Sequence, residues 1–166
     1  MPEDFAAAYR RATGMRLPTD RFAFADTPAK ADELAALVAQ GRKQATASLL
    51  ADYDPQQDPL PVTGERSVVL DGHDEPVCVI ETTDVELRPF DEVDAAFAYA
   101  EGEGDRSLDG WRTEHERFFR ERCEALGLDF TGDLEVVCER FTVAWAPAKS
   151  RYAERPDEST ARSGDG

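Results

Sequence analysis

Gly41, Lys43 and Thr46 form a Gly-x-Lys-x-x-Thr string that could support nucleophilic chemistry. If residues 43–46 form a helical turn, Lys43 and Thr46 share one face. A lysine desolvated in a cleft has a lowered pKa and can act as a base, and a threonine hydroxyl within reach is then a nucleophile. The alternative is a helix end followed by a solvated lysine and a threonine that caps the next turn. The glycine spacing does not match a Walker phosphate-binding loop.

A second candidate segment, residues 101–107, alternates acidic residues with glycines. The glycines would let the backbone approach a ligand closely, and Glu101 or Glu103 could act as a general acid or base or hold Lys43 in place. The segment does not fit a calcium loop, because Arg106 stands at the position that requires glycine. Alternatively, these residues form a flexible acidic connector in which Ser107 caps the following helix.

A third candidate, His115, falls on an apolar helical stripe together with Leu108, Trp111, Phe118, Cys123 and Leu126. A lone histidine on such a face is more often a hydrogen-bonded core residue than a ligand. No second histidine at ligand spacing accompanies it, so we expect no metal cage of protein ligands. Glu81 interrupts an apolar strand and fits a solvent face and a buried, partnered position equally well. His73 falls in an expected turn, where it would be exposed.

The composition narrows the classes of partner. The net charge is −16, most of it in the middle of the chain, whereas the first quarter is nearly neutral. This charge disfavours long duplex nucleic acid and anionic membrane surfaces. No apolar run approaches the roughly 20 residues of a membrane span, and the N-terminus lacks the pattern of a signal peptide. Three widely spaced cysteines indicate reduced, buried thiols in a cytoplasmic protein.

The elements that must position these groups can be read from periodicity and caps. Residues 3–13, 28–40, 91–100 and 108–126 are expected to be helices, residues 67–70, 77–87 and 134–145 strands, and the proline-rich residues 51–64 a loop. This order predicts an α+β fold with a small, mixed or mostly antiparallel sheet. We expect one domain over residues 1–146 and a disordered polar tail over residues 147–166.

Together these segments resemble the longer bacterial branch of the ASCH domain family, which is similar to PUA-like domains. The resemblance covers roughly residues 28–146 and rests on four segments in order: the Gly-x-Lys-x-x-Thr string, Val79 to Thr82, Ala100 to Asp105, and Trp111 to Phe119. It implies a PUA-like small β-barrel or mixed sheet flanked by helices. It also implies a nucleoside or short single-stranded RNA as the partner, and the negative charge argues against a membrane partner.

The resemblance implies a hydrolase that deacylates an N4-acylcytidine-type nucleoside. Lys43 would be its base, Thr46 its nucleophile and Glu103 the orienting carboxylate, with Glu101 as the alternative. No cofactor is expected. The substrate-binding residues implied are Gly41, Arg42, Glu101, Arg106, Ser107, Trp111 and Tyr53.

Two alternative functions remain open. The first is a ribonuclease in which Arg42, Lys43 and Arg106 neutralise phosphate and Tyr53 or Trp111 stacks on a base. A divalent cation at residues 101–105 could assist it. The second is a binding module without catalysis, in which Lys43 only contacts phosphate.

Overall fold

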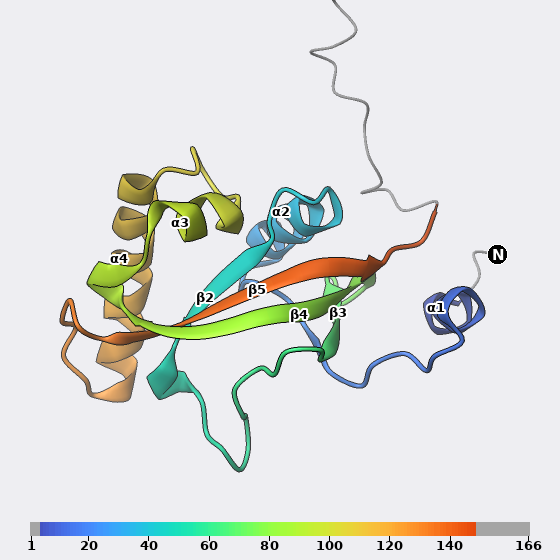
Figure 1. Cartoon of the computed structure of the whole chain (residues 1–166), viewed down its shortest axis with the longest axis horizontal. Coiled ribbons are helices and arrows are strands. Elements are labelled where there is room, and N and C mark those ends of the chain that lie inside the picture. The colour runs from blue at the N-terminus through green and yellow to red at the C-terminus, as the bar shows by residue number, and fades with distance from the viewer. Residues whose placement is uncertain (1–3, 149–166) are drawn as a thin grey trace, which may run out of the picture.

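A five-stranded mixed sheet forms the centre of the computed structural model, which describes residues 4–148 (Figure 1). The strands run in the order β1-β3-β4-β5-β2, and β1 pairs parallel with β3 while the other neighbours are antiparallel. Their bounds are β1 (Arg21–Phe22), β2 (Ala45–Leu49), β3 (Arg66–Leu70), β4 (Pro76–Pro89) and β5 (Glu135–Trp145). The α+β class and the mixed sheet are thus confirmed.

Four helices flank this sheet: α1 (Phe5–Thr13), α2 (Pro28–Ala39), α3 (Ala95–Glu101) and α4 (Leu108–Leu126). In Figure 1, α3 and α4 lie at one end of the sheet and α1 at the other. Local sequence explains the helix ends. The Thr27 hydroxyl caps α2, the Ser107 hydroxyl accepts from Gly110 N to cap α4, and Gly127 closes α4 in the left-handed conformation. No helix in the described part of the chain is long and apolar enough to span a membrane.

The structure decides two alternatives that the sequence left open and corrects one helix boundary. The sheet is not closed into a barrel: within residues 4–148 the outer strands β1 and β2 do not pair, and the start of β2 is instead covered by α3, where Gln44 N donates to Ala100 O. Residues 43–46 form no helical turn, because pairing with β5 makes Ala45–Leu49 a strand. The third helix begins at Ala95 rather than 91, because the Asp94 carboxylate accepts from Phe97 N and caps it there.

The expected tail, residues 147–166, lies outside the described residues apart from its first two positions.

The buried face of α4 differs from the predicted stripe. Trp111, Phe119 and Cys123 are buried, with His115 between them, so the inward positions recur every four residues. Phe118 is 48% exposed and Phe119 fully buried, although the sequence pattern favoured Phe118. This face packs with the apolar side of β2 and β5, formed by Ala45, Leu49, Val136 and Cys138. Burial of all three cysteines, each unpaired, is confirmed.

The two adjacent phenylalanines give a matched test of this packing. Phe119→Ala should lower the free energy of unfolding by about 3–5 kcal/mol, because it leaves a cavity in a closed core. Phe118→Ala, its neighbour on the exposed side, should cost about 1 kcal/mol or less. Urea denaturation of both variants measures the difference, and equal losses would contradict the observed helix orientation.

Candidate functional site

The Lys43 side chain is buried, with 2% of its surface exposed, and ends among four acceptors. Its Nζ lies 2.9 Å from Glu103 Oε2 and 2.9 Å from Ala45 O. Glu101 O and Glu101 Oε2 are both 3.4 Å away. An ammonium group has three N–H donors, so these acceptors use its whole donor capacity. The geometry therefore fits a charged Lys43 that donates hydrogen bonds.

Two chain segments come together to create this environment. At the end of α2, Lys43 N donates to Leu37 O while Gly41 turns the chain with a φ of 76°. At the end of α3, Gly102 has a φ of 71°, and a Cβ there would lie 2.3 Å from Arg42 O. Only glycine allows this backbone approach. The close contact places Glu101 and Glu103 on either side of Gly102, next to Lys43.

Glu101 links Lys43 to His115. Glu101 is 1% exposed, and its Oε1 lies 3.3 Å from His115 Nε2. His115 Nδ1 lies 2.8 Å from Trp111 O, and a carbonyl can only accept, so Nδ1 carries a hydrogen. The His115 ring stacks on Trp111 with a centroid distance of 4.2 Å. His115 is therefore the inward, hydrogen-bonded residue that the sequence predicted, and it contacts a charged cluster as well as the core.

The pKa values of the cluster follow from burial and these charges. Burial acts to raise the pKa of Glu101, but Lys43 and then His115 outweigh it, and the pKa falls well below the usual range. Burial acts to lower the pKa of His115, but the Glu101 carboxylate outweighs it, and the pKa is raised. The pKa of Glu103 is raised, mainly by burial and with a further contribution from Glu101, although Lys43 opposes the shift.

Glu101, Glu103 and His115 each offer one donor atom within 4.8 Å of the others, a spacing that could hold a metal ion. The Lys43 ammonium already lies between the two carboxylates, however, and would repel a second cation there. The donor set fits an ion-pair cluster better than a metal centre.

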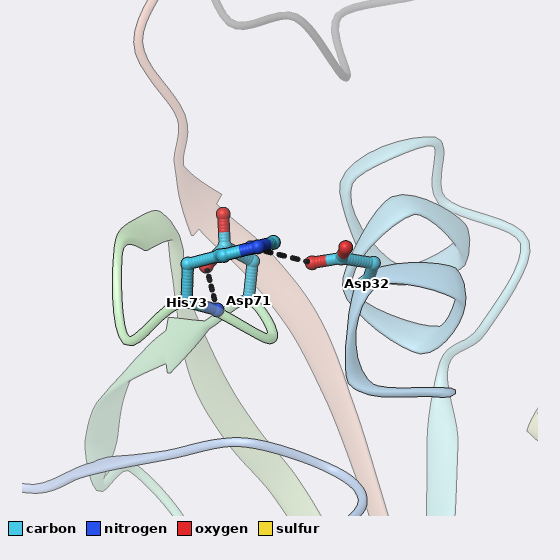
Figure 2. A group of neighbouring side chains, drawn as sticks. All are labelled: Asp32, Asp71 and His73. Carbon is cyan, nitrogen blue, oxygen red and sulfur yellow. Dashed lines mark hydrogen bonds and ion pairs between the residues drawn. The ribbon is translucent and has the colours of Figure 1, made fainter. Parts of the chain in front are cut away.

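A second group of similar residues, Asp32, Asp71 and His73, holds a turn in place. Figure 2 shows the exposed His73 ring directed at Asp32 of α2, with 3.8 Å between Nδ1 and Oδ1. Asp71 Oδ1 accepts from His73 N and Glu75 N, while Asp32 Oδ1 accepts from Gly72 N. The Asp71 bonds close the β3–β4 turn, and the Asp32 contacts join this turn to α2.

The other predicted binding residues are only partly brought together. Arg42 and Arg106 lie beside the cluster, but their guanidinium groups donate to the carbonyls of Gly102, Gly104, Tyr99 and Arg42. Ser107 caps α4. Trp111 is 6% exposed and packs on Phe90, so it offers no open face for a base. Tyr53 does not join the Lys43 cluster, and its hydroxyl lies 2.7 Å from Ser48 Oγ of β2.

Glu81 combines both of the positions considered for it. Its side chain is 37% exposed, and its Oε1 accepts from Arg66 Nε at 3.0 Å.

Thr46 lies on β2 with a partly buried side chain, and its hydroxyl forms no hydrogen bond with any residue that the structure describes. It therefore makes no direct bond to Lys43. Phe24, which the sequence analysis missed, lies nearby, with its ring centroid 5.4 Å from Lys43 Nζ and 5.8 Å from the Phe141 ring. No local signal marks Phe24, because only the fold brings it to Lys43.

Comparison with known proteins identifies related structures. A family model described as the ASCH domain matches residues 20–144. The crystal structure of an ASCH domain from Lactobacillus crispatus JV V101 is similar, with 35% identity, a TM-score of 0.71, and coverage of 75% of this chain and 78% of that one. A protein of Enterococcus faecalis V583 gives 35% identity and a TM-score of 0.75 over 89% and 94% of the two chains. No match was found among curated proteins.

The His115–Glu101 contact predicts a pH-dependent contribution to stability. Because the pKa of His115 is raised on folding, the contribution is complete below its ordinary pKa of about 6.5 and is lost as pH rises through the raised folded value. His115→Gln should therefore cost about 1.5–3 kcal/mol at acidic pH and less at alkaline pH. Urea denaturation across this range measures the loss.

The control is the same substitution made beside Glu101→Gln. Without the carboxylate, His115→Gln should no longer cost more at acidic than at alkaline pH, because burial alone acts to lower the pKa of His115. A pH-independent cost of His115→Gln in the otherwise unchanged protein would contradict the pairing.

Proposed function

The chain belongs to the ASCH domain family, and we propose that it is a hydrolase that deacylates an N4-acylcytidine-type nucleoside. The reaction would cleave the amide between an acyl group and the exocyclic amine of the base.

The charge balance around Lys43 is the observation that carries this proposal. Glu101 and Glu103 already neutralise the Lys43 ammonium, so the cluster presents no net positive charge to a phosphate. Arg42 and Arg106 donate to the carbonyls of Gly102, Gly104 and Tyr99, and the whole chain carries a net charge of −16. Lys43 therefore has no uncompensated charge to offer a phosphate, whereas a neutral nucleoside needs none.

The geometry supports a division of roles among three residues. Thr46, with its unengaged hydroxyl, is the nucleophile that attacks the acyl carbon. The positive charge of the Lys43 ammonium stabilises developing negative charge, a role that fits its ammonium form better than the base role expected from the sequence. Glu103, 27% exposed and 2.9 Å from Nζ, orients Lys43 where a ligand can reach it. Glu101 is buried and forms the second ion pair with Lys43.

Hydrolysis of N4-acetylcytidine, followed by ultraviolet absorbance, tests this function. Thr46→Val keeps the branched shape that suits a strand but removes the nucleophile, and Glu103→Gln removes the charge that orients Lys43. Each should lower kcat/KM by about 100-fold or more. Lys43→Arg should also lose activity. The control is Lys30→Ala on α2, which should retain full activity because the Lys30 side chain is 47% exposed.

Absence of turnover by the unmodified protein would contradict the proposal. A labelled single-stranded RNA, tested with and without divalent cations, would then distinguish cleavage from binding. Phosphate binding would weaken steeply with added salt.

A further inference from the structure

Glu139 is the titratable residue that faces Thr46 across the β2–β5 pair. In the register of β2 and β5, Thr46 stands directly opposite Glu139. Phe141 N donates to Gln44 O, and hydrogen-bonded pairs recur every second residue, so Thr46 and Glu139 also form such a pair. Their Cα atoms are then about 5.5 Å apart and both side chains point to the same face. This face is opposite to the one that packs against α3 and α4.

The surroundings of Glu139 suit a base. The carboxylate is partly buried, and its Oε1 accepts a hydrogen bond of 2.8 Å from the Thr82 hydroxyl of β4, which fixes its position. Burial raises the pKa of Glu139; the Thr82 bond opposes this shift, and Glu65 and Asp20 add to it. Tyr53, whose own pKa is raised in part by Glu139, is the other titratable group close by. Each of these charged neighbours is acidic, and none is a cation that would pair with the carboxylate.

We propose that Glu139 is the general base that activates Thr46, an inference that rests on the proposed acyl-transfer function. Thr46 Oγ1 bonds to the acyl carbon as its proton passes to Glu139 and the carbonyl electrons move to oxygen. Collapse of this intermediate breaks the C–N bond, and Glu139 returns the proton to the departing amine. Water then attacks the Thr46 ester, gives a proton to Glu139 and releases the carboxylic acid, while Glu139 returns that proton to Oγ1.

Lys43 is less suited to this step. All of its donor capacity is used by acceptors, and it makes no bond to Thr46. Glu139 carries a carboxylate at the opposite register position and has a lone pair to accept the proton. The two groups therefore take different parts of the reaction.

A small activated ester tests Glu139 without requiring any nucleoside. The protein is treated with p-nitrophenyl acetate, and acetylation of the Thr46 peptide is followed by mass spectrometry. Glu139→Gln keeps an acceptor for Thr82 but removes the base, and should slow acetylation by about 100-fold. Glu135→Gln on the exposed start of β5 is the matched control, and Thr46→Val defines the background. Thermal unfolding confirms that each variant is folded.

The pH dependence separates a base from a merely structural residue. The acetylation rate of the unmodified protein should fall as the pH drops through the raised pKa of Glu139. Glu139→Gln should lose this acidic limb while unfolding at nearly the same temperature.

The inference is overturned if Thr46 is not acetylated in the unmodified protein, or if Glu139→Gln reacts at the unmodified rate. If Thr46 is acetylated in a Glu139-dependent way but N4-acetylcytidine is not hydrolysed, the proposed substrate is wrong and the inference stands.

Discussion

The buried ammonium group of Lys43 is the constraint on which the arrangement of the site depends. Removing a charged group from water costs several kcal/mol, and the cost is offset only by well-placed opposite charges and hydrogen bonds. Glu101, Glu103 and Ala45 O supply them. Because the two glutamates flank Gly102, the end of α3 must lie against the end of α2, which only a glycine at that position permits. The position of α4 depends on the same cluster, because its residue His115 contacts the Glu101 carboxylate.

One face of the sheet packs against α3 and α4 in the core, and the other carries the residues to which we assign chemistry. Along β2, Ala45 and Leu49 face the core beneath α3 and α4, whereas Thr46 lies on the other face. Along β5 the same alternation buries Val136 and Cys138 and presents Glu139 beside Thr46. Because side chains alternate strictly along a strand, a shift of one residue in the β2–β5 register would bury Thr46 and expose the core positions. Core packing therefore also fixes the place of the proposed nucleophile.

Charge distribution limits the ligand that such a site can accept. The cluster around Lys43 is balanced internally, and the neighbours of Glu139 are acidic. An anionic ligand would gain no uncompensated charge from Lys43 and would meet repulsion near Glu139, whereas a neutral base with hydrogen-bonding edges would not. This local balance agrees with the net charge of the whole chain and makes an uncharged nucleoside the ligand class that we favour.

The local sequence determined where the helices end and which residues are candidates for the functional site. Caps such as Thr27, Ser107 and Gly127 act within a few residues, so their effects could be predicted. The Gly-x-Lys-x-x-Thr string and the glutamate pair identified Lys43, Glu101 and Glu103. Ionisable side chains next to glycines can be recognised as candidate site residues from the local sequence alone.

Only the tertiary structure decided which of these groups meet. Pairing with β5 made Thr46 a strand residue and placed Glu139 opposite it, and packing of α4 selected Phe119 over Phe118. Phe24 reached Lys43 from a distant segment. Strand register and helix orientation depend on contacts between residues far apart in the chain, which no local pattern specifies.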